Sequence, residues 1–159
     1  RFLLPALCDV GESELAYKII TQTGYPSWGY MLENGATTVW ERWNGYTGEN
    51  GFENPERNSF IHYSLGSCVE WLYSYVLGIK LSADKPVCVK PTFFEKLKYA
   101  QGCYAGKNGN VYVKIENKNS AVAVEITSDG GAEYTYDFSG REILSVERRG
   151  KTEIITLKK

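Results

Sequence analysis

The hydrophobic pattern of this chain changes its period near residue 80, and this change limits the fold more than any other feature. Before it, apolar residues recur at the spacing of one helix face. After it, β-branched residues alternate with polar ones, as in strands with one buried face. The 159 residues therefore predict an α+β chain in two domains: helices in residues 1–79 and an antiparallel β-sandwich in residues 80–159.

The first part predicts short helices joined by loops. Helical spacing occurs over residues 2–8, 14–21, 26–33 and 64–77. Ser13 can cap the second of these helices and Pro26 can begin the third, because Ser accepts hydrogen bonds at a helix start and Pro is tolerated in the first turn. The fourth has Leu65, Val69, Leu72 and Val76 on its predicted buried face. These apolar stripes outnumber the partners within the segment, which predicts further helices outside it and some self-association of the chain alone.

Between the third and fourth helices the pattern is less regular. Residues 37–40 are β-branched or aromatic and predict an extended segment. Residues 44–58 are rich in Gly, Asn and Glu and predict a long loop. In the second part, strands are predicted over residues 111–115, 122–126 and 154–157, with turns at Asn108-Gly109, Asp129-Gly130 and Arg149-Gly150.

Composition excludes several classes of partner and site. The formal net charge is −1, which gives no electrostatic reason for binding nucleic acid or an anionic membrane. No apolar run is long enough to span a bilayer. The four cysteines are widely spaced and there is one histidine, so no zinc site and no other cofactor is predicted. Two disulfides or free thiols both fit, with a buried free thiol favoured at Cys8 and Cys68.

Two further features concern the origin of the chain and its chemistry. The chain begins at Arg1 without a leader pattern, which we interpret as a cut inside a larger protein whose targeting signal is not visible. Aromatic residues are concentrated between residues 24 and 63, beside carboxylates and His62. Flat rings and polar groups together suit a sugar, although any single ring is more often part of a core. Glu41 lies where the extended segment gives way to a loop, and by position alone it is either a catalytic carboxylate or half of a surface ion pair.

The motifs in this region resemble those of a known family. Residues 25–31 read YPSWGYM and residues 35–43 read GATTVWERW. Residues 58–63 read NSFIHY, followed by Gly66 and by EWLY at residues 70–73. In this order and spacing they are similar to the α-L-rhamnosidases of glycoside hydrolase family 78. The resemblance covers most of residues 1–79, whereas the β-rich remainder matches only as the expected C-terminal sandwich.

The resemblance implies a bacterial parent with an (α/α)6 toroid that removes terminal α-L-rhamnosyl groups with inversion. In such a reaction two carboxyl groups stand roughly 6.5–9.5 Å apart, so that a water fits between one of them and the sugar. By resemblance, Glu41 is the general base, His62 binds the sugar, and Trp40 and Trp43 are assigned to the pocket wall. The expected partners are rhamnose-containing glycans and the missing N-terminal part of the parent.

Two departures and three alternatives accompany this interpretation. Asn44 replaces the frequent Asp of the family, and Ile61 stands where many members carry Asn. The general acid of the family matches no residue here, so the chain alone is predicted to be inactive. One alternative is a carbohydrate-binding module, which the absence of Trp from residues 80–159 disfavours. The others are a purely structural sandwich and a different glycosidase or lyase on the same toroid.

Overall fold

The computed structural model describes residues 2–54, 56 and 58–159. The chain divides into two compact units, Arg1–Trp71 and Leu72–Lys159. The α-helices lie in the first unit and the two larger sheets in the second. The predicted domain boundary at residue 79 lies inside the second unit and stays a prediction. Within the described ranges, every helix is too short or too polar to cross a membrane.

The first unit contains five short α-helices. They are α1 (Leu3–Asp9), α2 (Ser13–Thr21), α3 (Trp28–Glu33), α4 (Tyr63–Gly66) and α5 (Cys68–Trp71). Ser13 is the first residue of α2 and makes no capping bond, so its predicted role was wrong. Pro26 lies before α3, whose cap is Ser27: its Oγ accepts a hydrogen bond from the Tyr30 amide at 2.9 Å.

The predicted helix over residues 64–77 is divided. A break at Ser67 separates α4 from α5, and the chain continues as a π-helical turn, η2 (Leu72–Val76). The Leu77 amide donates to the Leu72 carbonyl, an i to i+5 bond. A π-helical turn has more residues per turn than an α-helix. The buried face that was predicted at 3.6 residues per turn is therefore not continuous over residues 64–77. Val69 and Leu72 are exposed, contrary to prediction, whereas Trp71 is buried.

The segment between α3 and α4 also differs from expectation. Residues 37–40 form no strand, and the backbone bends at Thr37 and Thr38. Inside the predicted loop, β1 (Tyr46–Thr47) and β2 (Gly51–Phe52) form a small antiparallel hairpin. Residues 55 and 57 of that predicted loop lie outside the described residues.

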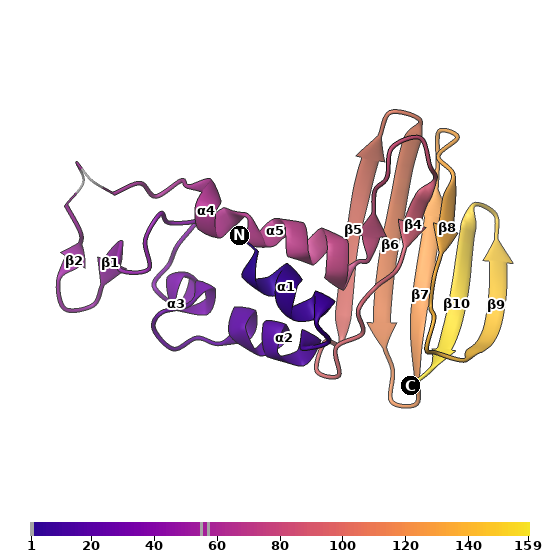
Figure 1. The fold of residues 1–159 in the computed structure, drawn as a ribbon, viewed down its shortest axis with the longest axis horizontal. Helices are drawn as coiled ribbons and strands as arrows, with labels where there is room; N and C mark the ends of the chain where they lie inside the picture. Colours follow the sequence, from indigo (N-terminus) through magenta and orange to yellow (C-terminus); the bar gives the residue numbers. More distant parts are fainter. Residues whose placement is uncertain (1, 55, 57) are drawn as a thin grey trace. The chain divides into compact units, whose positions relative to one another are not determined.

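The second unit contains two sheets (Figure 1), and buried residues from both form one core. Its strands are β3 (Ile79–Lys80), β4 (Val87–Val89), β5 (Tyr99–Gly106), β6 (Gly109–Asn117), β7 (Ala121–Ser128), β8 (Tyr134–Tyr136), β9 (Ile143–Arg149) and β10 (Thr152–Lys158). Five form an antiparallel sheet in the order β5-β6-β7-β10-β9, and three form a sheet in the order β3-β4-β8. The predicted α+β class is confirmed, although the β4–β8 pair is parallel.

The core of this unit follows the predicted alternation. On β6, Val111, Val113 and Ile115 are buried, and on β7 and β10 the inward residues are equally excluded from solvent. The β9–β10 hairpin is closed by Gly150 and Lys151, one residue after the predicted turn at Arg149-Gly150. The turn between β5 and β6 lies at Lys107–Asn108, one residue before the predicted position. The sheet register therefore follows the hydrophobic pattern.

Candidate active site

Two irregular segments lie side by side in the first unit and bring the predicted site residues onto neighbouring stretches of backbone. The Glu41 amide donates to the Ser59 carbonyl at 2.8 Å, and the His62 amide donates to the Val39 carbonyl at 3.0 Å. The pairing is antiparallel, but neither segment is long enough to form a regular strand. It satisfies backbone groups that would otherwise lack partners.

Glu41 is held by the same pairing. Its Oε2 accepts a hydrogen bond from the Ser59 amide at 3.0 Å, and the residue is partly buried. This bond fixes one carboxylate oxygen, while a carboxylate can accept further bonds at the other. The neighbouring Arg42 forms its ion pair with Glu53, at 3.7 Å between Nη1 and Oε1. Glu53 is partly buried, and its amide donates to the Gly45 carbonyl at 3.0 Å.

His62 is the N-cap residue of α4. Its Nδ1 accepts a hydrogen bond from the Ser64 amide at 3.2 Å. In neutral histidine one ring nitrogen accepts and the other donates, so this cap assigns the hydrogen to Nε2. The ring is stacked on that of Tyr63, with 5.1 Å between centroids and 19° between planes. The cap and the stack together orient Nε2 as a donor.

The aromatic residues of this region pack on one another in small groups rather than lining one open pocket. Trp40 is buried, with 4% of its surface exposed, and contacts Tyr46 and Phe60 edge-to-face at 6.3 and 5.8 Å. Trp43 contacts Trp28 in the same manner at 5.0 Å. Edge-to-face packing of this kind is typical of a core. The ring of Trp40 is therefore part of the buried packing of the first unit.

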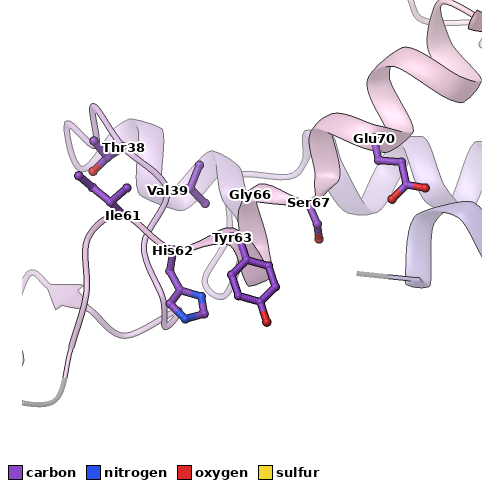
Figure 2. A pocket seen from close by; sticks show the side chains of 8 residues that line it. All are labelled: Thr38, Val39, Ile61, His62, Tyr63, Gly66, Ser67 and Glu70. Atoms are coloured by element: carbon purple, nitrogen blue, oxygen red, sulfur yellow. The ribbon is translucent and has the colours of Figure 1, made fainter.

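A shallow depression of about 570 Å³ lies beside this region (Figure 2). It is lined by Thr38, Val39, Ile61, His62, Tyr63, Gly66, Ser67 and Glu70. Figure 2 shows the side chains of His62 and Tyr63 projecting next to each other from the start of α4, with Ser67 and Glu70 further along the same helical stretch. Glu41, Trp40 and Trp43 are not among the lining residues.

The sequence placed Ser59, Tyr63 and Glu70 in the family motifs without a role, and it did not indicate Ser67. Tyr63, Ser67 and Glu70 follow one another at the i, i+3 and i+4 spacings that place residues on one helix face, so this signal was present in the sequence. Ser59 orients Glu41 through its backbone amide. No side-chain pattern indicates a backbone donor in an irregular segment.

The described residues contain no group of three or more His, Cys, Asp and Glu side chains able to hold a metal. All four cysteines are free and partly exposed, so Cys8 and Cys68 are less buried than predicted. Cys8 Sγ accepts a hydrogen bond from Trp71 Nε1 at 3.1 Å. Burial raises the pKa of Cys68, which lowers its thiolate fraction at neutral pH.

Comparison with known families and sequences identifies relatives of this arrangement. Residues 1–76 match the family model described as the bacterial α-L-rhamnosidase six-hairpin glycosidase domain. An α-L-rhamnosidase of Streptomyces avermitilis is 36% identical over 119 residues, which is 74% of this chain and 12% of that protein. An α-L-rhamnosidase of Alteromonas sp. is 36% identical over 129 residues, 77% of this chain and 14% of that protein. The chain thus spans a small part of the length of these relatives.

Solved structures give the same result for the whole fold. The Streptomyces avermitilis α-L-rhamnosidase, solved in complex with L-rhamnose, matches 98% of this chain and 16% of its own, with a TM-score of 0.77 and 26% identity. The α-L-rhamnosidase from Dictyoglumus thermophilum matches 99% of this chain and 19% of its own, with a TM-score of 0.73 and 26% identity. The chain belongs to the bacterial α-L-rhamnosidase family, and its residues 1–76 correspond to the six-hairpin glycosidase domain of that family.

Proposed function

We propose that this chain supplies the general base of an inverting glycoside hydrolase that removes terminal α-L-rhamnosyl groups. Glu41 takes the proton from the attacking water, and His62 binds a sugar hydroxyl. The observation that carries the proposal is the backbone pairing of residues 39–41 with 59–62. This pairing brings the backbone segments that carry Glu41 and His62 next to each other, and the Ser59 amide holds the Glu41 carboxylate.

The anchoring suits the work of a base. A general base must lie within hydrogen-bond reach of the proton that it removes, so its geometry matters before its acidity. A bond from the Ser59 amide to Oε2 restricts rotation of the carboxylate, so that Oε1 can face a water molecule. Holding a reactant in place in this manner reduces the entropic part of the barrier.

The Nε2 hydrogen of His62 complements an acceptor oxygen of the sugar, because the cap from Ser64 occupies Nδ1. Tyr63 stacks on the imidazole and limits its rotation. Trp40 and Trp43 act differently in this proposal. Trp40 packs behind the site on Phe60, while the partly exposed Trp43 remains a wall residue.

The chain alone lacks part of this machinery. Inversion requires a second carboxyl group as general acid, and the family resemblance matches none of the carboxylates here to that role. We therefore propose that residues 1–159 are inactive by themselves and that the rest of the parent chain completes the site. The family's domain of six hairpins would also cover the exposed apolar residues of the first unit, for example Val10 and Leu32. The domain boundary at residue 79 is part of the same proposal.

The test is hydrolysis of a chromogenic α-L-rhamnoside by the parent protein and its Glu41→Gln variant. We expect kcat to fall roughly 10²–10⁴-fold, the usual contribution of acid–base catalysis. Glu33→Gln is the matched control, because Glu33 lies at the end of α3, outside the paired segments that hold Glu41 and His62, and it should keep normal activity. Near-normal turnover by Glu41→Gln would reject the general-base assignment.

A second measurement tests the stereochemistry. Proton NMR of the first product formed by the active parent should show the β anomer of rhamnose before mutarotation, because water attacks from the side opposite the leaving group. Azide should restore part of the turnover of Glu41→Gln, because an anion attacks without losing a proton. Initial release of the α anomer would contradict inversion while leaving the substrate class intact.

A further inference from the structure

The outer face of the five-stranded sheet carries a depression whose surface is mainly apolar with several polar side chains, and it has no part in the proposed catalysis. It has a volume of about 600 Å³ and is lined by Gln101, Gly102, Cys103, Tyr112, Val113, Lys114, Glu125 and Thr127. These residues belong to the three neighbouring strands β5, β6 and β7. We propose that this depression binds a neutral sugar unit through its hydroxyl groups.

The strand register explains the depression. Cys103 is opposite Tyr112, and Tyr112 is opposite Thr127, so one row across three strands has short side chains on both sides of a ring. In the next row outward on this face, Lys114 lies between Gln101 and Glu125. The long side chains of the second row therefore stand beside the short side chains of Cys103 and Thr127, and the difference in length leaves the depression.

Alternation on β6 places this chemistry on the outside of the sheet. Val111 and Val113 are buried in the core at 0% and 1% exposure, whereas Tyr112 is 41% exposed. Successive strand residues point to opposite faces. The absence of Trp from residues 80–159 disfavoured a carbohydrate-binding module on sequence grounds. The ring of Tyr112 is instead available as an apolar surface of the kind that packs on the C–H face of a sugar.

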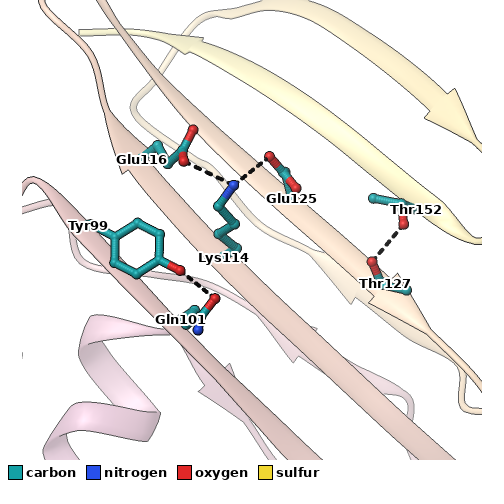
Figure 3. Close-up of polar contacts among 7 residues, drawn as sticks. All are labelled: Tyr99, Gln101, Lys114, Glu116, Glu125, Thr127 and Thr152. Carbon is teal, nitrogen blue, oxygen red and sulfur yellow. Dashed lines mark hydrogen bonds and ion pairs between the residues drawn. The ribbon is translucent and has the colours of Figure 1, made fainter.

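The polar groups of this face are held in place before any ligand arrives (Figure 3). Lys114 Nζ lies 2.9 Å from Glu116 Oε1 and 3.2 Å from Glu125 Oε1. The hydroxyl of Tyr112 donates to Asp129 Oδ2 at 3.3 Å. Side chains that are already ordered lose less entropy on binding. A carboxylate also accepts several hydrogen bonds, so Glu125 can hold Lys114 and receive a sugar hydroxyl together.

The charged groups of this face already have partners. Three carboxylates, those of Glu116, Glu125 and Asp129, lie on the lining or next to it, and three lysines act on them: Lys114 through ion pairs with Glu116 and Glu125, and Lys118 and Lys151 through their fields on Glu116 and Asp129. The charges balance, so a phosphate, a uronate or a nucleic-acid backbone finds no net attraction and would have to compete with two carboxylates for Lys114. A neutral ligand with adjacent hydroxyls can accept from the Lys114 ammonium and donate to the carboxylates without that competition. These donors and acceptors favour a neutral sugar.

The test is a titration of the ¹⁵N-labelled chain of 159 residues with methyl α-L-rhamnoside, a panel of other neutral methyl glycosides, and D-galacturonate. We expect saturable amide shifts at Cys103, Tyr112 and Lys114 with at least one neutral glycoside, and much smaller shifts with galacturonate. Only the choice of a rhamnoside as a probe depends on the proposed function; binding of any other neutral glycoside tests the depression independently. Shifts confined to residues 38–70 would report the catalytic unit and reject the site on the sheet.

Variants separate the site from general contact with the sheet. Tyr112→Ala and Lys114→Gln should each weaken binding about tenfold or more. Thr156→Ala is the matched control, because Thr156 is a partly exposed β10 residue on the same outer face and does not line the depression. It should bind as the parent sequence does. Since Lys114 is a polar, partly exposed residue, Lys114→Gln tests the proposal even if Tyr112→Ala disturbs the fold. Equal affinity for galacturonate, or unchanged affinity in both variants, would overturn the proposal.

Discussion

The two units of this chain use their apolar residues differently. Among the described residues, the second unit (Leu72–Lys159) buries fifteen hydrophobic residues, whereas the first unit (Arg1–Trp71) buries Leu4, Ala16, Met31, Trp40 and Trp71. The first unit also exposes large apolar side chains on most of its elements, including Leu15 on α2 and Leu32 on α3. A sheet pair can close a core between its own faces, whereas a few short helices cannot.

This difference has a consequence for stability. Burial of apolar area is the main favourable contribution to folding, so the second unit should be the more stable of the two. All four tryptophans (Trp28, Trp40, Trp43 and Trp71) lie in the first unit. Tryptophan fluorescence therefore reports the unfolding of the helices, while the β signal in far-UV circular dichroism reports the sheets. Urea titrations followed by both signals can compare the units within one sample.

The largest expected effect is a loss of core packing in the second unit. Leu157→Ala should lower the free energy of unfolding by about 2–5 kcal/mol, because Leu157 is fully buried on β10. Its matched control is Leu32→Ala in the first unit, where Leu32 is 70% exposed and the change should stay within about 0.5 kcal/mol. The measurement is the urea midpoint of each signal. Equal losses in the two variants would mean that the first unit has a core that these contacts do not explain.

The same contrast decides how much of the fold could be predicted from the sequence. The predicted strands over residues 111–115, 122–126 and 154–157 lie inside β6, β7 and β10, because alternation shows both the element and its buried side. The short strands β3, β4 and β8 have two or three residues each, too few to show a period.

Helical periodicity was a weaker guide. It located α1, α2 and α3 to within two residues, but it misassigned the buried face of residues 64–77, where Val69 is exposed and Trp71 is buried. That stretch is apolar on more than one side, so its period does not single out a face. In the candidate site, Glu41 and His62 came from motif resemblance. Their pairing through Ser59 and Val39 could not be predicted, because it joins backbone groups of irregular segments.

The next effect concerns Gly78, which lies in the second unit between η2 and β3. Gly78 has a φ of +72°, and a Cβ there would overlap the backbone of Lys90 and Pro91. Gly78→Ala should cost roughly 2–4 kcal/mol from backbone strain and overlap together. Gly150→Ala is the control: its φ is +62° with open space around it, so only the strain of about 1–2 kcal/mol applies. A shift of the fluorescence transition rather than the β signal would assign residue 78 to the helical unit.

A smaller effect is expected in the first unit. Ser27→Ala removes the cap of α3, in which the buried Ser27 Oγ accepts from the Tyr30 amide, and should cost about 1 kcal/mol. Ser13→Ala is the matched control, because Ser13 begins α2 without a capping bond and should change stability by less than about 0.5 kcal/mol. The fluorescence midpoint should move for Ser27→Ala alone. A comparable loss from Ser13→Ala would show that the cap predicted from sequence does form in solution.

The smallest effect is confined to acid and to the second unit. A hydrogen bond from Lys90 Nζ to Asp137 Oδ2, at 2.6 Å, lowers the pKa of Asp137 to about 2, and the Ser139 amide contributes. The pKa of an unfolded Asp is about 3.9, so the folded state favours the ionised carboxylate. The resulting stabilisation is complete above about pH 4 and is lost as the pH falls through about 2.

The urea midpoint of the far-UV circular dichroism signal should therefore fall over this pH range in the unmodified chain. It should fall less steeply in Asp137→Asn, and also in Lys90→Met. Because both residues lie in the sheet unit, the difference should be absent from tryptophan fluorescence. Parallel pH curves for the three proteins would show that the ion pair adds nothing to the stability of the sheets, as is common for exposed pairs.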